Sequence, residues 1–193
     1  MELKRVVVTG IGMVTPLGND VPTVWNNLLE GKSGAAAITH FDASKFKTQF
    51  ACEVKDLDMS SLLDPKELRR YDRYILYAIK SAEEALQDAQ ITLPAHNPLR
   101  YGVIYGSGMG GVKALDANIG AFGAGDGTPR HSPFFIPMAI ANMAAGMLAI
   151  RYGFKGVNYA TTSACSSSAH AIANAYYQIR MGLADVILTG GSE

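Results

Sequence analysis

Cys165 is the residue of this chain whose type and surroundings best suit covalent chemistry. A short β-type run, Gly156 to Thr162, precedes it, and a helix-type run, Ser166 to Met181, follows it. The N–H groups and dipole of a helix N-terminus favour the thiolate, which is the attacking form of cysteine. The same N–H groups can stabilise an oxyanion formed on an attacked acyl carbonyl. The alternatives are a nucleophile, with room for an acyl group among small neighbours, or a small buried apolar residue.

The histidines provide no identifiable base for this cysteine. His170 lies five positions after Cys165. That spacing is about 140° around a helix axis, so His170 is not expected to face the thiol. His131 lies in a Gly-rich polar segment, Ala121 to Ser132, that is typical of a loop. None of the four histidines has metal-ligand spacing with another histidine or a cysteine, so no metal site is predicted.

Two glycine-containing runs resemble nucleotide-binding motifs, but neither has the full pattern in its usual context. Val6 to Gly12 has Thr15 where a third glycine is required. Gly106 to Gly111 does match G-x-G-x-x-G after a strand-like run, but the acidic residue at about the right distance, Asp126, lies in a loop. Close approach of the backbone to a ligand or a partner chain explains these glycines equally well. We therefore predict no cofactor.

Three basic residues form an edge of the helix that we expect over Pro65 to Ala89. Lys66, Arg69 and Arg70 stand at positions i, i+3 and i+4, which share one face of an α-helix. Arg73, three residues after Arg70, adds a fourth basic residue, and Glu67 and Asp72 interrupt this patch. Such an edge is either an ordinary solvated helix face or a docking surface for an acidic partner, and the spacing alone leaves both readings open.

The composition is that of a well-buried globular protein with one domain. The 193 residues are 48% hydrophobic and 18% charged with a formal net charge of zero, so no global charge favours nucleic acid or a membrane. Two cysteines do not make a disulfide framework, which favours a reducing cytoplasm, and Cys52 is interpreted as a packing residue in a strand. We find no signal-peptide pattern and no apolar run long enough to span a bilayer.

Strand-like and helix-like runs alternate along the chain, which indicates an α/β fold with a mostly parallel sheet. The predicted strands are Arg5–Thr9, Gln49–Val54, Tyr101–Tyr105, Val157–Thr161 and Asp185–Thr189. The predicted helices are Pro22–Leu29, Pro65–Ala89, Val112–Ala121, Pro137–Tyr152 and Ser166–Met181. The last two helices are poor in charge nearly all round, so we expect a further layer or a partner to cover them.

Several of these segments together resemble the β-ketoacyl-acyl carrier protein synthases of fatty acid synthesis, closest to the type II synthases. The segments that carry the resemblance cover the whole chain in order: Arg5 to Gly12, Gly106 to Gly111, Ser132 to Pro137, Thr162 to Ser167 and Ala184 to Glu193. The resemblance implies a thiolase-like fold, in which a mixed, mostly parallel sheet is layered with helices. It also implies an acyltransferase that forms 3-oxoacyl-acyl carrier protein by decarboxylating condensation of a malonyl group.

The resemblance assigns roles to particular residues. Cys165 would be the nucleophile that carries the acyl chain as a thioester, with its own N–H as one oxyanion donor. Met109 would line the acyl pocket, and Phe134 and Phe135 would lie at a homodimer interface where the partner subunit closes that pocket. The acidic carrier protein, loaded with an acyl or malonyl group, would bind to four basic residues: Lys66, Arg69, Arg70 and Arg130.

Members of that family are roughly twice as long, because their fold packs two similar halves together. On this basis residues 1–193 are expected to be the N-terminal thiolase-like domain, with the C-terminal half outside this chain. The two catalytic histidines, the lysine and the second oxyanion donor of the family would lie in that other half. An alternative of another class is a non-catalytic half that acts as a binding or assembly partner of a second chain through its apolar faces.

Overall fold

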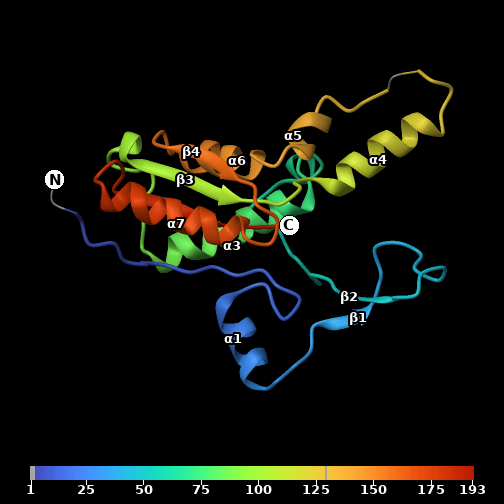
Figure 1. Cartoon of the computed structure of the whole chain (residues 1–193), viewed down its shortest axis with the longest axis horizontal. Coiled ribbons are helices and arrows are strands. Elements are labelled where there is room, and N and C mark those ends of the chain that lie inside the picture. The colour runs from blue at the N-terminus through green and yellow to red at the C-terminus, as the bar shows by residue number, and fades with distance from the viewer. Residues whose placement is uncertain (1–2, 129) are drawn as a thin grey trace.

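A three-stranded parallel sheet forms the centre of the fold in a computed structural model that describes residues 3–128 and 130–193 (Figure 1). Its strands are β3 (Tyr101–Gly106), β4 (Asn158–Thr161) and β5 (Val186–Gly191), in the order β4-β3-β5. The register pairs Gly106 with Thr161 on one side and with Gly191 on the other. The carboxyl ends of all three strands therefore meet at one edge of the sheet.

The helices of the fold are α1 (Val21–Leu29), α2 (Pro65–Leu68), α3 (Arg73–Asp88), α4 (Val112–Gly123), α5 (Phe135–Ala139), α6 (Met143–Tyr152) and α7 (Ser167–Arg180), with a 3-10 turn η1 (Pro98–Arg100). Helices α3, α6 and α7 lie against this sheet, whereas α1, the α4–α5 arm and one small hairpin stand apart from it (Figure 1). The hairpin pairs β1 (Ala35–Ala37) with β2 (Phe50–Cys52) in antiparallel fashion. The predicted α/β class and parallel sheet are confirmed.

Strand β3 is buried on both faces because helices cover each side of it. Val103 and Tyr105 belong to the larger apolar cluster with residues of α3 and α6. Ile104, which points the opposite way, packs with Ala171 and Ala175 of α7. This alternation places α7 against one face of the sheet and the α3–α6 pair against the other, so the N-terminus of α7 is fixed relative to the strand ends.

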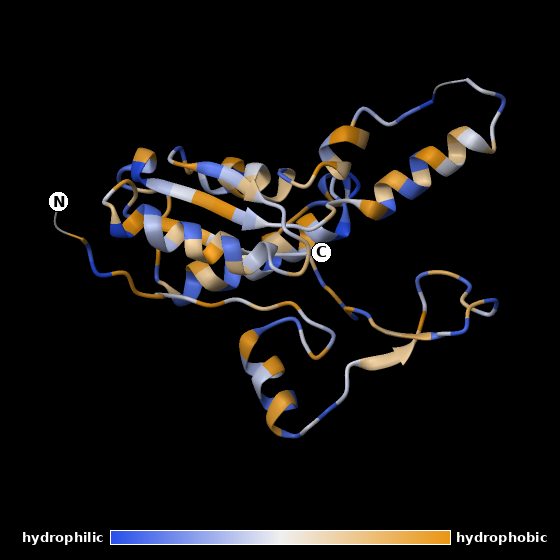
Figure 2. Cartoon of the chain, viewed as in Figure 1, coloured by the Kyte–Doolittle hydropathy of each residue, from blue (hydrophilic) through white to orange (hydrophobic). Residues whose placement is uncertain are grey.

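The predicted N-terminal strand is wrong. Arg5–Thr9 is extended but pairs with no strand, and Val7 and Val8 remain 60% and 80% exposed. Figure 2 marks several apolar residues along this extended segment. Hydrogen bonds tie the segment to helices instead: the Lys4 N–H donates to the Arg180 carbonyl, and the Ile11 N–H donates to the Asp88 carboxylate. The Arg5–Thr9 segment thus has the apolar pattern of a strand but lies beside no strand in the described residues.

The long helix predicted over Pro65–Ala89 is also wrong, since the chain turns between α2 and α3. Asp64 and Glu67 form a capping box that starts α2, which ends after one turn. Asp72 precedes α3, but its buried carboxylate does not cap that helix and instead accepts the N–H of Ala114 in α4, 2.9 Å away. Between α2 and α3 the chain is therefore not helical, and the Asp72 side chain bonds to α4 rather than to the first turn of α3.

The predicted helix over Pro137–Tyr152 is divided in a similar way. α5 begins earlier, at Phe135, and the extended backbone of Ile140 separates it from α6. The end of α5 lies against two glycines of the turn that follows β3, and the Gly111 N–H donates to the Ala139 carbonyl at 3.0 Å. Within residues 3–128 and 130–193, no helix is both long and apolar enough to cross a lipid bilayer.

Candidate active site

Cys165 lies in the turn that connects β4 to the N-terminus of α7. The thiol is free and exposed. Ala164, directly before it, has a φ of +50°, a left-handed conformation that a residue with a Cβ adopts only at a cost. The Ser166 N–H donates to the Ser163 carbonyl at 3.1 Å, and Ser166 occupies the N-cap position of α7 without a side-chain cap hydrogen bond. Cys165 therefore lies directly before the N-terminus of α7, and its predicted position between a strand and a helix is confirmed.

Ser167 holds this turn in place from inside the fold. Its side chain is buried, and its hydroxyl accepts the N–H of Ser163 at 2.9 Å while donating to the carbonyl of Ala164 at 2.7 Å. The Thr161 hydroxyl donates to the Ser167 carbonyl at 2.8 Å and joins the end of β4 to the same residue. Since buried polar groups need partners, this network specifies a single conformation of the turn that holds Cys165.

The glycines at the strand ends let α7 approach the sheet closely. A Cβ on Gly106 would lie only 2.5 Å from the carbonyl carbon of Ser167, so no larger residue fits at the end of β3. Gly191, at the end of β5, meets the Ser168 side chain in the same way. The first glycine of the G-x-G-x-x-G run thus meets a packing requirement within this chain, against α7, whereas the sequence suggested a ligand or a partner chain as the close neighbour.

His170 lies in the first turn of α7 and is bonded to a serine of the preceding turn. Its Nδ1 is 2.6 Å from the Ser163 hydroxyl, two residues before the cysteine. No hydrogen bond joins His170 to Cys165 in the described part of the chain, so this geometry does not assign the histidine as a base. Sequence reasoning missed both this pair and the role of Ser167. A serine in the first turn of a helix was the available signal.

The turn after β3 lies beside the turn that holds Cys165. Its residue Gly108 is close to Ala164, since a Cβ built on Gly108 would be 3.6 Å from the Ala164 Cα. Met109 is next in the chain and is 67% exposed, and its place along an acyl pocket stays a prediction. The carboxylate of Glu193 accepts the N–H groups of Gly108 and Met109 at 2.6 and 3.0 Å. Sequence reasoning did not identify Glu193.

The aromatic pair predicted for the acyl pocket lies at the start of α5. Phe134 is 37% exposed, and the guanidinium carbon of Arg70 lies 5.1 Å from its ring centroid, within cation–π range. Phe135 stacks on His131 with ring centroids 5.6 Å apart. The structure therefore brings one predicted carrier-protein residue, Arg70, together with one predicted pocket residue, Phe134.

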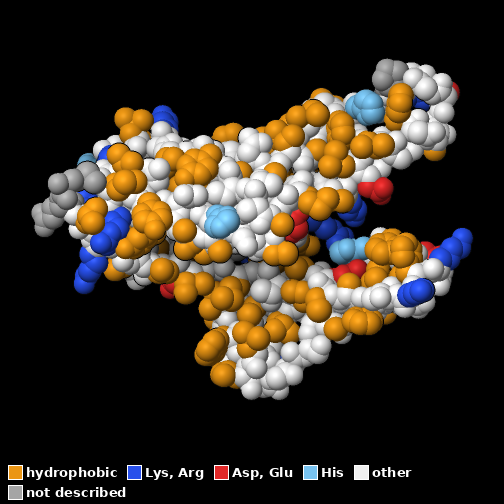
Figure 3. Space-filling view, in the orientation of Figure 1, with side chains coloured by type: hydrophobic (Ala, Val, Ile, Leu, Met, Phe, Trp, Pro, Cys, Tyr) orange, Lys and Arg blue, Asp and Glu red, His pale blue; other side chains and the backbone are white. Residues whose placement is uncertain are grey.

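The four predicted carrier-binding residues are all on the surface, but they do not share one helix face. Lys66 is in α2, whereas Arg69 caps that helix and Arg70 follows in the turn before α3. Arg130 lies in the loop after α4, 3.7 Å from the Asp126 carboxylate in an exposed ion pair. Figure 3 shows Lys and Arg side chains gathered beside the hollow between the β1–β2 hairpin and the α4–α5 arm. The three basic residues that were predicted to share one helix face, Lys66, Arg69 and Arg70, thus lie in and directly after α2, and we call this segment the basic turn.

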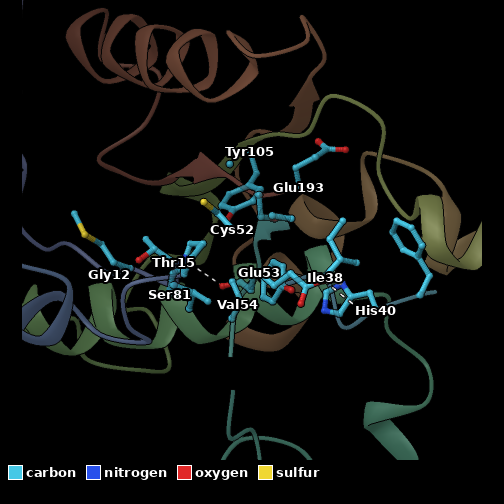
Figure 4. Close-up of a pocket in the computed structure, with 18 residues that line it drawn as sticks. Gly12, Thr15, Ile38, His40, Cys52, Glu53, Val54, Ser81, Tyr105 and Glu193 are labelled. Atoms are coloured by element: carbon cyan, nitrogen blue, oxygen red, sulfur yellow. Dashed lines mark hydrogen bonds and ion pairs between the residues drawn. The ribbon is translucent and has the colours of Figure 1, made fainter. Parts of the chain in front are cut away.

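A hollow of about 680 Å³ is lined by the β1–β2 hairpin, the N-terminal segment, α3 and the ends of β3 and β5 (Figure 4). Cys52, Glu53 and Tyr105 are among its lining residues. The prediction of Cys52 as a packing residue is wrong: it is exposed, because the hairpin pairs only with itself and leaves this strand uncovered. Burial raises the pKa of Tyr105, so this phenol stays neutral at ordinary pH. Cys165 does not line this hollow.

The parallel sheet lies between α7 on one face and the α3–α6 pair on the other, and a free thiol follows the carboxyl end of β4 in a strained strand-to-helix turn. Together these features define the thiolase-like class. Residues 3–193 match the family model for the beta-ketoacyl synthase N-terminal domain, and the chain belongs to this family. The resemblance inferred from the sequence is thereby confirmed.

Individual relatives agree with this assignment. The chain is 45% identical over 193 residues to the 3-oxoacyl-[acyl-carrier-protein] synthase 2 of Coxiella burnetii, and 42% identical to that of Synechocystis sp.. Each alignment covers 100% of this chain and 46% of the relative. The structure of the ishigamide ketosynthase/chain length factor matches with a TM-score of 0.89 at 26% identity, over 99% of this chain and 48% of that one. The chain thus spans less than half the length of the proteins it resembles.

Proposed function

We propose that this chain is the nucleophile half of a β-ketoacyl-acyl carrier protein synthase of type II, acting in fatty acid biosynthesis. The observation that carries the proposal is Cys165, a free and exposed thiol held by the Ser167 network at the N-terminus of α7, within a family match over residues 3–193. The curated relatives are synthases of 3-oxoacyl chains on acyl carrier protein by name.

The first half-reaction that we propose is acyl transfer to Cys165. The thiolate attacks the thioester carbonyl of the acyl-carrier protein, and the new C–S bond forms as the carrier's thiol leaves. The Cys165 N–H, at the start of the α7 region, is one donor to the oxyanion of the tetrahedral intermediate. The exposure of the thiol supports access by a substrate that arrives on a protein.

The second half-reaction is decarboxylating condensation. A malonyl group on carrier protein loses carbon dioxide, and the carbanion attacks the Cys165 thioester. The new C–C bond forms, the C–S bond breaks and the cysteine thiolate is released for another cycle. The proton-handling histidines, the lysine and the second oxyanion donor would come from the second half of the synthase, because the family places them there.

The carrier protein would dock on the basic turn between α2 and α3. Lys66, Arg69 and Arg70 are exposed, and none of them makes an ion pair with a residue in the described ranges 3–128 and 130–193. Basic side chains that are not engaged in ion pairs attract an acidic partner and increase its association rate. The contact between Arg70 and Phe134 would place that docking surface at the rim of the acyl pocket.

The apolar side chains left exposed support a second half that covers them. Val8, Leu29 and Phe50 are 80%, 70% and 65% exposed, and exposed apolar side chains mark interaction surfaces where they gather. We propose that residues 1–193 form the N-terminal domain and that the domain with the remaining catalytic groups packs on this surface. The arm of α4 and α5, where Ile119 and Ile136 are also exposed, would contribute to a homodimer. A reducing cytoplasm would keep Cys165 as a free thiol.

The test uses the assembled synthase, defined as this chain together with the second half that the proposal requires. Purified assembled synthase is incubated with acyl- and malonyl-carrier protein, and 3-oxoacyl-carrier protein is measured by mass spectrometry. We expect product from the wild type and none from Cys165→Ala. Product formation at the wild-type rate by Cys165→Ala would instead favour a non-catalytic binding half, for which the exposed apolar surface is the specific support.

A further inference from the structure

Glu193 accepts three hydrogen bonds from one short turn, although it lies 85 residues after Gly108 in the sequence. Its Oε2 accepts the Gly108 N–H at 2.6 Å and the Ser107 hydroxyl at 3.2 Å, and its Oε1 accepts the Met109 N–H at 3.0 Å. The Ser107 hydroxyl in turn accepts the Gly110 N–H at 3.1 Å. Glu193 therefore engages the N–H groups of Gly108 and Met109 directly and that of Gly110 through Ser107.

The far side of the same turn is fixed by close backbone packing. Gly110 has a φ of +78°, and a Cβ there would lie 2.6 Å from the Ala139 carbonyl oxygen. Gly111 lies equally close to the end of α5, and its N–H donates to the Ala139 carbonyl. The turn is thus held between Glu193 on one side and α5 on the other, while the Met109 side chain remains exposed.

We propose that Glu193 is a positioning residue that sets the place of Met109 beside Cys165 and thereby determines which acyl chain lengths the thiol accepts. This inference rests on the proposed function, in which Met109 lines the acyl pocket. The contact between Gly108 and Ala164 makes the link, because the turn that Glu193 holds lies directly against the residue before the nucleophile. Movement of this turn would change the space available at Cys165.

The carboxylate, rather than the length of the side chain alone, is required. Two oxygens accept from three donors here, and hydrogen bonds to an ionised acceptor are shorter and stronger than neutral ones. In Glu193→Gln the amide NH2 would replace one oxygen and face an N–H or O–H donor. At least one bond would be lost, and the Met109 turn would relax while the size of the side chain stays the same.

The experiment measures acylation of Cys165 in the assembled synthase with hexanoyl- and hexadecanoyl-carrier protein. In Glu193→Gln the ratio of the two rates should change by at least about threefold, because pocket shape discriminates between acyl chains in the bound state. In a Met109→Ala background the same substitution should leave the ratio unchanged, since the group that the carboxylate positions has been removed. Glu30→Gln is the matched control, because Glu30 forms an exposed ion pair with Lys32, and it should keep the wild-type ratio.

A second readout separates this inference from the proposed function. Alkylation of Cys165 by N-methylmaleimide and by N-dodecylmaleimide needs no acyl transfer, and its rate ratio should also change in Glu193→Gln. If Glu193→Gln does not fold, Ser107→Ala removes one donor and tests the same turn. Unchanged ratios in both assays, or equal loss for both chain lengths, would overturn the positioning role. Absence of acyl transfer with altered alkylation ratios would overturn the proposed function alone.

Discussion

The hydroxyl of Ser167 lies 2.9 Å from the backbone nitrogen of Ser163 and accepts its hydrogen bond, which ties the first turn of α7 to the strand side of the cysteine turn. The same hydroxyl donates to Ala164. One buried side chain thus joins the two residues that precede Cys165 to the helix that follows it. The position of the thiol depends on a contact that spans four residues and on the burial of the serine.

Ser167→Ala should loosen this turn. It leaves the Ser163 N–H and the Ala164 carbonyl without their side-chain partner, at a cost of about 2 kcal/mol in the free energy of unfolding. The acylation rate of Cys165 should fall, because the thiol is no longer held in one place. Thermal unfolding and acylation kinetics of the assembled synthase measure both effects. Ser166→Ala is the matched control, since that exposed serine makes no side-chain cap, and it should behave as wild type.

Ala164 should tolerate glycine but not a β-branched residue. At φ +50° an L-residue costs about 1–2 kcal/mol relative to glycine, and a branched Cβ raises the cost further. Ala164→Gly should keep acylation at Cys165 and the melting temperature near their wild-type values. Ala164→Val should lower both. A melting temperature for Ala164→Val equal to that of Ala164→Gly would show that the turn is not strained.

Charge reversal on the basic turn should weaken the use of carrier protein without changing the chemistry at the thiol. For Arg69→Glu the KM for acyl-carrier protein should rise roughly fivefold and become less sensitive to salt, whereas acylation by a small acyl-pantetheine thioester should stay constant. Lys155→Glu makes the same charge change at an exposed site away from the turn and should have no effect. A similar rise in KM for both variants would contradict docking at the turn.

The ion pair that supports the start of β5 should contribute to stability in a pH-dependent way. Hydrogen bonds from the Arg100 guanidinium, at 2.8 and 3.1 Å, lower the pKa of the Asp185 carboxyl below 3.8. A lowered folded-state pKa stabilises the fold above the unfolded-state value, and this contribution is lost as pH falls through the folded-state pKa. The melting-temperature difference between wild type and Asp185→Asn should therefore shrink from pH 7 to about pH 3. A constant difference would contradict this assignment.

Local signals in the sequence predict the centre of the fold. The apolar runs at β3, β4 and β5 and the small residues around Cys165 are sufficient to place the thiol between a strand and a helix, and the structure confirms that placement. These elements are predictable because neighbours in sequence decide them: burial on both faces for β3, and a strand-to-helix change within a few residues for the cysteine turn.

Contacts between distant residues account for what the sequence does not predict. The predicted helix over Pro65–Ala89 is interrupted at Asp72, which has an extended backbone and accepts the Ala114 N–H. The Met109 turn bonds to Glu193, far along the chain. The Arg5–Thr9 run has a strand pattern but no strand beside it within the described residues. Periodicity reports which side of a segment is apolar, but it does not report which distant partner satisfies a given N–H or carboxylate.

The intact mass of the assembled synthase after incubation with acyl-carrier protein tests the central claim most directly. We expect the mass of the chain to rise by one acyl group, with the adduct located on Cys165 by peptide mapping, lost in Cys165→Ala and retained in Cys52→Ala. An acyl adduct that persists in Cys165→Ala, or wild-type protein that stays unmodified under conditions in which a synthase 2 relative is acylated, would contradict the assignment of Cys165 as the nucleophile.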